Sequence, residues 1–300
     1  MLRQLVPGDL EAITQICQVG MPHDRFFPEL VKEKTLGARD YDPGLSLVDE
    51  NSGCIRGFVQ GVFGEALGVP HGWIRLMVVH PSFRKQGIGS LLLQEIENRL
   101  RAKGARKIST MDSVANYLTP GVDFRYTEAY GFFEKHGYQR ARENMNLICE
   151  VRPGQFDVSA DIDRLEHEGF QIKQADSADK EHVLKFLRAE FPAWVGEVLE
   201  CYRNRPISLY ICYHQGEVVG FSAYEGNNRN TGWFGPMGVL PMTRGRGIGR
   251  VLCQLCLSDI ARQGHTQSII PWVGPVRFYS KVCNSRLDRI FWVYEKELAG

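Results

Sequence analysis

Apolar residues along the chain follow two patterns. Short apolar runs at residues 45–48, 55–63 and 73–79 are typical of buried strands. Each half of the chain then has a segment with apolar residues at helical spacing, and further short runs follow it. These helical positions are Ile88, Leu91, Leu92 and Ile96 in the first half and Ile248, Val251, Leu252 and Leu255 in the second. The pattern predicts a mixed α/β fold in which helices flank a twisted mixed sheet.

Two stretches of the chain match each other in gapless register at an offset of 160, residues 79–89 and residues 239–249. Both begin with a valine, have a proline two residues later, and contain Arg-x-x-Gly-x-Gly. Upstream, a Gly-Phe pair closes an apolar run in each half, at residues 57–58 and 220–221. Self-similarity of this kind indicates an internal duplication.

The halves are joined by a segment rich in Pro, Gly, Ser and Asp, which is typical of a linker and contains a short helical stretch. A chain of 300 residues also fits two domains of ordinary size. We therefore predict a first domain at residues 1–152, a linker at residues 153–168 and a second domain at residues 169–300.

Each repeated loop lies between a predicted strand and a predicted helix. Its glycines, Gly87 and Gly89 or Gly247 and Gly249, permit backbone conformations that bring main-chain N–H groups close to a ligand. The helix N-terminus that follows favours an anion, so the loop predicts a pyrophosphate cradle. The glycines could instead serve only a tight connection. The loop lacks both the Gly-Lys-Ser/Thr ending of nucleoside triphosphate loops and the Gly-x-Gly-x-x-Gly order of dinucleotide folds.

In this context the two loops resemble the acetyl-CoA loop of the GNAT superfamily of N-acetyltransferases. The resemblance implies acetyl-CoA as cosubstrate. The cofactor-binding residues that it implies are Val79, Arg84, Lys85, Gln86, Gly87, Ile88 and Gly89 in the first copy and Met237, Val239, Arg244, Gly245, Arg246, Gly247, Ile248, Gly249 and Arg250 in the second.

The resemblance also gives roles to parts of the second copy. Backbone N–H groups at residues 237–239 would polarise the thioester carbonyl, although Pro236 interrupts the donors of this strand. Arg246 or Arg250 would meet the 3′-phosphate of the cofactor. Both arginines could equally be solvated surface residues.

A later aromatic segment of the same family is present in both halves, at residues 129–138 and 276–284, but the two copies differ at one position. The family's tyrosine, which protonates the departing thiolate, corresponds to Tyr279 and is replaced by Phe133 in the first half. Tyr130 or Tyr138 could substitute there. The resemblance therefore assigns the general acid to Tyr279 and catalysis to the second half, unless Tyr279 is an ordinary core residue.

The acceptor amine must lose a proton before it attacks. Many family members have a glutamate on the strand before the loop, but residues 233–239 contain none. Glu225, at the end of the preceding strand, is the candidate base, and the alternative is a solvated turn carboxylate. A weak base or a water relay would suffice.

Aromatic and proline-rich segments of the second half, at residues 191–194, 232–236 and 269–275, resemble those of bacterial tandem-GNAT glucosamine and glucosaminide N-acetyltransferases. An amino sugar is thus the leading small-molecule acceptor, and Trp194 and Trp272 are candidates to pack on its ring. The alternatives are an aminoglycoside, a polyamine, the cysteinyl sugar of mycothiol synthesis, or a non-catalytic sensor that binds acyl-CoA.

Composition narrows the partners. Thirty-six basic and 35 acidic residues leave a net charge of +1, which argues against a nucleic-acid partner. No signal peptide and no run of about 18 apolar residues is found, so we expect no membrane partner. Eight scattered cysteines favour the reducing cytoplasm, and Cys253 and Cys256 lack a second pair that would complete a metal site. The oligomeric state does not follow from these patterns.

Overall fold

The computed structural model describes residues 1–66 and 68–298 and divides into two compact units. Unit 1 contains Met1–Asn144 and Ile290–Gly300, and unit 2 contains Met145–Arg289. The units do not follow chain order alone, because the last strand belongs with the first half of the chain. The ranges expected from the sequence, 1–152, 153–168 and 169–300, stay predictions of separately folding domains.

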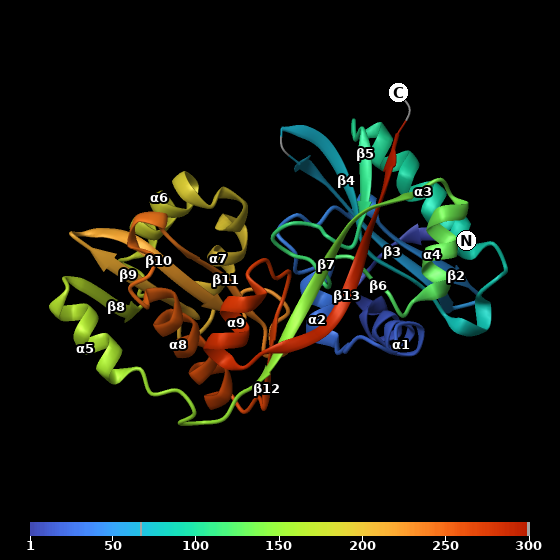
Figure 1. The fold of residues 1–300 in the computed structure, drawn as a ribbon. Helices are drawn as coiled ribbons and strands as arrows, with labels where there is room; N and C mark the ends of the chain where they lie inside the picture. The colour runs from blue at the N-terminus through green and yellow to red at the C-terminus, as the bar shows by residue number, and fades with distance from the viewer. Residues whose placement is uncertain (67, 299–300) are drawn as a thin grey trace. The chain divides into compact units, whose positions relative to one another are not determined.

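Unit 1 is built around a sheet whose strands pair in the order β1-β2-β3-β4-β5-β13, with β6 also paired to β13 (Figure 1). All neighbours are antiparallel except β4 and β5, which are parallel. The strands are β1 Leu2–Gln4, β2 Ser46–Asn51, β3 Cys54–Ala66, β4 Val69–Val79, β5 Lys107–Thr110, β6 Val122–Asp123 and most of β13 Arg286–Glu297. The helices are α1 Leu10–Gly20, α2 Pro28–Lys34, α3 Ile88–Ala102 and α4 Thr127–Lys135.

Unit 2 has an antiparallel sheet in the order β11-β10-β9-β8, and its β12 pairs with the second half of β7 (Figure 1). A single parallel bridge, Trp233–Ile269, joins β11 to β12 in the part of the chain described. The strands are the second half of β7 Gln139–Glu150, whose first half lies in unit 1, and β8 Phe170–Gln174, β9 Leu209–His214, β10 Glu217–Tyr224, β11 Phe234–Val239 and β12 Gln267–Ile270. The helices are α5 Ser159–His167, α6 Lys180–Glu190, α7 Val195–Cys201, α8 Ile248–Arg262 and α9 Val276–Cys283.

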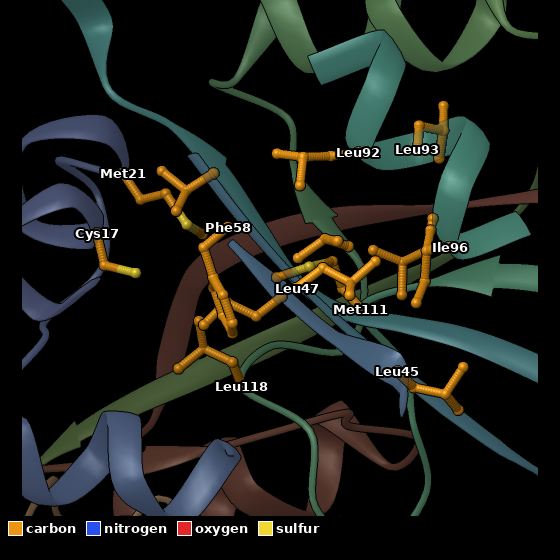
Figure 2. Packing of buried hydrophobic residues seen from close by; sticks show 14 of the residues in the cluster. Cys17, Met21, Leu45, Leu47, Phe58, Leu92, Leu93, Ile96, Met111 and Leu118 are labelled. Carbon is orange, nitrogen blue, oxygen red and sulfur yellow. The ribbon is translucent and has the colours of Figure 1, made fainter. Parts of the chain in front are cut away.

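Helix α3, which follows the first loop, packs closely on its sheet because the facing strand β3 has glycines. A Cβ on Gly57 of β3 would lie 2.9 Å from Leu92 Cδ1, and one on Gly61 would lie 2.7 Å from Ile96 Cδ1. Figure 2 shows Leu92 and Ile96 of α3 in the buried cluster with Phe58. The predicted apolar face of α3 was wrong at Leu91, whose side chain is 46% exposed. Successive residues of a helix are rotated by about 100°, so Leu91 lies to one side of the buried face that contains Leu92.

The predicted mixed α/β fold with helices flanking twisted sheets is confirmed in both units. Cys253 and Cys256 are both buried on the inner face of α8, where they pack in the hydrophobic cluster of unit 2. Among residues 1–66 and 68–298, no helix combines the length and apolar character needed to cross a membrane.

Candidate functional site

The repeated loop has the same backbone conformation in both units. A 3-10 turn ends each strand, and α3 or α8 then begins directly after Gly87 (φ 82°) or Gly247 (φ 91°). Two residues earlier, Lys85 (φ 61°) and Gly245 (φ 83°) are also left-handed. Since this region favours glycine, Lys85 holds a conformation that costs unit 1 free energy. The first glycine of each Gly-x-Gly is therefore needed for the turn itself.

The second glycine of each loop has another purpose. A Cβ on Gly89 would lie 3.2 Å from the ring of Phe132, and one on Gly249 would lie 3.6 Å from the ring of Phe278. Both aromatic rings come from the helix that carries the later segment, α4 or α9. The second glycine thus lets the aromatic helix approach the first turn of α3 or α8, which links the two repeated motifs physically.

The arginine that opens each motif ties the loop to the end of its strand. Arg84 Nε donates to Val79 O at 3.3 Å, and Arg244 Nε donates to Val239 O at 3.3 Å. Arg84 makes further contacts, since Nη2 donates to Gly20 O at 2.8 Å and Nη1 pairs with the Glu128 carboxylate at 3.0 Å. The Arg84 guanidinium is thus bonded to groups of the protein through all three of its nitrogens, whereas Arg244 is more exposed to solvent.

The strand before each loop presents N–H groups on its outer edge. His80 N donates to Arg56 O and Leu240 N donates to Val219 O, each at 2.9 Å, so these two N–H groups face β3 and β10. Because successive N–H groups of a strand point to opposite sides, those of Val79 and Val239 face away from these neighbours. The same alternation turns the N–H of Met237 outward.

Among the described residues, no strand pairs with the outer edge of β11 where these donors lie. The described pairing to β12 is the bridge at Trp233, which precedes Met237 and Val239 in the strand. By the same alternation, the backbone nitrogen of Pro236 points toward β10, beside the bulge between Ser222 and Tyr224. Its missing N–H therefore removes no outward donor, and the interruption noted in the sequence leaves both candidate donors in place.

Tyr279 is 8% exposed and lies in α9 beside β11. Its ring meets Phe234 edge to face at a centroid distance of 5.9 Å. Within residues 1–66 and 68–298, no hydrogen bond to its hydroxyl is found. Burial, with the thiols of Cys253 and Cys283 nearby, raises the pKa of Tyr279 well above its ordinary value. The phenol is therefore protonated at neutral pH and its O–H is free to donate to a ligand.

The corresponding position of unit 1 has no such group. The Phe133 ring packs against Tyr138 and Tyr294, at centroid distances of 5.3 and 6.2 Å. Of the two tyrosines that could substitute, Tyr130 donates its hydroxyl to Val122 O at 3.2 Å, and Tyr138 is only 2% exposed. The Tyr138 hydroxyl has no hydrogen-bond partner among the described residues, and a role of either tyrosine as the acid of unit 1 stays a prediction.

A second difference lies at the bulge of the strand before the loop. In unit 1, Leu76 pairs with Gln60 and Ile74 with Gly61, so Arg75 is the extra residue. The Arg75 side chain is fully buried and its Nη1 donates to Asp40 Oδ1 at 2.9 Å. In unit 2 an offset of 160 places Gly235 at this position. The bulge of unit 1 is therefore occupied by an internal ion pair that unit 2 lacks.

Glu225 is 5% exposed and has a left-handed backbone (φ 52°), so it is not a solvated turn residue. Its Oε1 accepts hydrogen bonds from the N–H groups of Gly232 at 2.7 Å and Trp233 at 3.0 Å, and Oε2 accepts one from Asn230. Burial outweighs these bonds and raises the pKa of Glu225. The carboxylate organises the segment that leads into β11, and its role as the base stays a prediction.

The two tryptophans expected at the acceptor lie on different elements of unit 2. Trp194 stacks on Phe191 at a centroid distance of 5.0 Å and also contacts Phe221, so one of its faces is covered. Trp272 follows β12, and its backbone N–H donates to Asn146 Oδ1 at 3.1 Å. Their contact with a sugar stays a prediction.

The charged residues beside the second loop include one that sequence reasoning missed. Arg246 pairs with Glu168 at 3.2 Å, and Arg250 pairs with Asp161. Arg164 Nη2 donates to Arg246 O at 2.8 Å. Arg164 lies in α5, within the range expected to be a linker, and a basic residue inside the short predicted helix was the only sequence signal for it.

Comparison with known families gives a match on both halves. The model of the "Acetyltransferase (GNAT) family" matches residues 13–138 and 172–283. An acetyltransferase of Yersinia enterocolitica is 36% identical over 84 residues, which cover 28% of this chain and 55% of that protein. One of Pectobacterium atrosepticum is 37% identical over 84 residues, again 28% of this chain and 55% of that protein. The chain spans about half the length of the curated relatives it matches.

Solved structures resemble the whole chain. A region described as a GCN5-related glucosamine N-acetyltransferase, in a fungal multi-domain GH3 β-N-acetylglucosaminidase, has a TM-score of 0.81 at 21% identity and covers 99% of this chain and 38% of that one. A GCN5-related N-acetyltransferase of Sphaerobacter thermophilus has a TM-score of 0.70 at 18% identity, covering 99% and 95%. A tandem GNAT protein of the clavulanic acid pathway has a TM-score of 0.68 at 14% identity, covering 100% and 99%. At these identities the likeness shows the fold.

Proposed function

The chain belongs to the acetyltransferase (GNAT) family, and from this premise we propose that it is an acetyl-CoA-dependent N-acetyltransferase with one reaction centre, in unit 2. One observation carries the assignment to unit 2. The Tyr279 hydroxyl is protonated and free of hydrogen bonds to the described residues, whereas unit 1 has Phe133 at the matching position. The ion pair of Arg75 at the unit 1 bulge supports the same division.

The residues of unit 2 suit direct transfer. Acetyl-CoA supplies the acetyl group as a thioester, and the loop from Arg244 to Gly249 would hold its pyrophosphate on main-chain N–H groups at the start of α8. The outward N–H groups of Met237 and Val239 would donate to the carbonyl oxygen as negative charge develops there. The amine nitrogen would bond to the carbonyl carbon, the carbon–sulfur bond would break, and Tyr279 would give its proton to the leaving sulfur. Tyr279 would then regain a proton from solvent, which receives the one that the amine loses.

The proton that the attacking amine loses needs an acceptor. Both oxygens of Glu225 already accept backbone N–H groups, so we propose that Glu225 mainly holds residues 226–233 in place. Water can then carry the proton away, since an α-amino-like group titrates near pH 8 and needs only a weak base.

For the acceptor we propose an amino sugar such as glucosamine. The support is the resemblance of the Trp- and Pro-containing segments, and the fungal structural neighbour that is itself described as a glucosamine N-acetyltransferase. Trp194 and Trp272 would pack on the sugar. The second candidate is another small amine, and the third is a sensor that binds acyl-CoA without turnover.

Thiol release from acetyl-CoA across a panel of amines separates these candidates. The panel contains glucosamine, an aminoglycoside, a polyamine and a cysteinyl sugar. Release that depends on glucosamine supports the proposal, and release with another amine only would replace the acceptor. An absence of release with every amine, despite binding of coenzyme A, would favour the sensor.

Tyr279→Phe tests the reaction centre. Because the hydroxyl makes no hydrogen bond to the described residues, we expect the variant to fold as the wild type does. Loss of a general acid should lower kcat by about 100-fold or more, with the KM for acetyl-CoA little changed. Tyr202→Phe, which removes another hydroxyl of unit 2 that has no hydrogen-bond partner among the described residues, is the matched control. Full turnover by Tyr279→Phe would show that another group protonates the thiolate.

A further inference from the structure

The second loop has a neighbour that the first loop lacks. A Cβ on Gly247 would lie 3.2 Å from Nη2 of Arg164, whereas one on Gly87 would have nothing within 4 Å. Arg164 belongs to α5, which lies outside the repeated motif. Its guanidinium therefore lies directly against the glycine that shapes the proposed phosphate cradle of unit 2.

This guanidinium is held in position but keeps donors to spare. Nη1 donates to Glu168 Oε1 at 2.6 Å, and Nη2 donates to Arg246 O at 2.8 Å and lies 3.6 Å from Asp161 Oδ1. An arginine has five N–H donors in a planar fork, and these contacts leave some of them unused. The side chain is 44% exposed, so the remaining donors are within reach of a ligand.

The surrounding charges favour an anion. The cluster contains four arginines and two carboxylates, so its net charge is +2 (four minus two). Arg164, Arg246 and Arg250 pair with Asp161 or Glu168, and Arg244 is bound to the end of β11. It lies beside the N-terminus of α8, where the helix dipole adds positive potential. Beside the first loop, Arg84 and Lys85 face Glu128, for a net charge of +1. An anionic ligand would thus bind more strongly at the second loop.

We propose that Arg164 of α5 is a phosphate-binding residue of the coenzyme A site in unit 2, and that it contacts the pyrophosphate rather than the 3′-phosphate. The position beside Gly247 points to the pyrophosphate, because this glycine lies at the centre of the cradle. The inference rests on the proposed placement of the reaction centre in unit 2. It also makes α5 of unit 2 one wall of the cofactor site.

The test is binding of coenzyme A to the full chain, without any acceptor, by titration calorimetry. Arg164→Gln should weaken binding of coenzyme A and of dephospho-coenzyme A alike, by about tenfold, as expected for one charged hydrogen bond. Arg164→Lys should recover part of the loss, since lysine keeps the charge without the fork. Arg188→Gln, an exposed arginine of α6 in the same unit, should bind as the wild type does.

A merely structural role for Arg164 predicts a different salt dependence. If Arg164 contacts phosphate, the gap between wild type and Arg164→Gln should shrink as ionic strength rises. A gap that does not depend on salt, or equal binding by both proteins, would overturn the inference. A loss confined to coenzyme A, with dephospho-coenzyme A unaffected, would overturn the pyrophosphate assignment.

Hydrogen exchange separates this failure from failure of the proposed function. Coenzyme A should protect the backbone of residues 241–250 in unit 2 of the wild type. If only residues 81–90 of unit 1 are protected, the assignment of the reaction centre to unit 2 is wrong and the proposed function fails. If residues 241–250 are protected but Arg164→Gln changes nothing, the inference about Arg164 alone fails.

Discussion

Replacing Glu225 separates the two roles that this carboxylate could have. Its Oε1 accepts the N–H groups of Gly232 and Trp233, both of which are buried, whereas the third donor, on Asn230, is exposed. Glu225→Ala would leave two buried N–H groups without an acceptor. At about 1–3 kcal/mol for each group, the expected loss in the free energy of unfolding is about 2–6 kcal/mol.

Glu225→Gln should be much milder. The amide oxygen can replace Oε1 as the acceptor for Gly232 and Trp233, and a neutral amide is cheaper to bury than a carboxylate. We expect a loss of about 1 kcal/mol or less. Denaturant unfolding of the three proteins gives both values. If Glu225 holds the loop, Glu225→Gln should keep kcat within a few-fold of wild type, because the segment before β11 keeps its shape.

The pH dependence of stability supplies an independent check. Burial raises the pKa of Glu225 in the folded protein above its usual value of about 4.5. The folded state then binds more protons than the unfolded state, so the contribution of Glu225 to stability is largest below the usual pKa and is lost as pH rises through the folded pKa. The difference in stability between wild type and Glu225→Gln should therefore shift in favour of the variant over this window.

Two outcomes would refute this reasoning. If the free energy of unfolding of Glu225→Ala is within about 1 kcal/mol of the wild-type value, the two buried N–H groups find other acceptors. The cost of about 1–3 kcal/mol for each group then does not apply here. If Glu225→Gln folds normally but loses kcat by about 100-fold, with a changed pH–rate profile, Glu225 is the base and the water route is wrong.

Two further predictions concern packing and the loop. Gly238→Ala places a Cβ 2.7 Å from the ring of Phe191, so it should lower the free energy of unfolding by about 1–3 kcal/mol. Adding Phe191→Leu should restore most of this loss in denaturant unfolding, and a double variant that shows no rescue would mean that another contact is responsible. Gly87→Ala should lower the free energy of unfolding by about 1–2 kcal/mol, because its backbone is left-handed although a Cβ there would meet no other atom. Gly8→Ala, where a Cβ is equally free of contacts and φ is not positive, should leave the stability unchanged, and equal effects of the two variants would contradict the backbone strain.

Local patterns predicted the repeated parts of the molecule well. The helical spacing from Ile88 and from Ile248, and the Arg-x-x-Gly-x-Gly between strand and helix, depend on neighbours within a few residues, and the structure has these elements where expected. The exposed Leu91 shows the limit of this approach. Leucine fits the apolar pattern of a helix, but which side is buried depends on the strand glycines that receive it.

Features that depend on how the chain folds back on itself could not be predicted in this way. Glu225 looked like a turn carboxylate, because nothing in the residues beside it shows that the segment folds back onto its oxygens. Arg164 lies 82 residues from the carbonyl that it contacts, and the linker composition around it suggested no role. The return of β13 to unit 1 could not be predicted either, because no residue near it in the sequence shows which strand it pairs with.

The placement of β13 sets the order in which the molecule can be completed. Residues 295–297 pair with residues 107–109 of β5, and Tyr294 N donates to Thr110 Oγ1 across 184 residues of chain. During synthesis unit 2 has all its strands before the last residues of β13 emerge, whereas the sheet of unit 1 waits with an open edge beside β5. Closing a loop of this length is slow compared with pairing of neighbouring strands. The half of the protein that is made first is thus the half that is finished last.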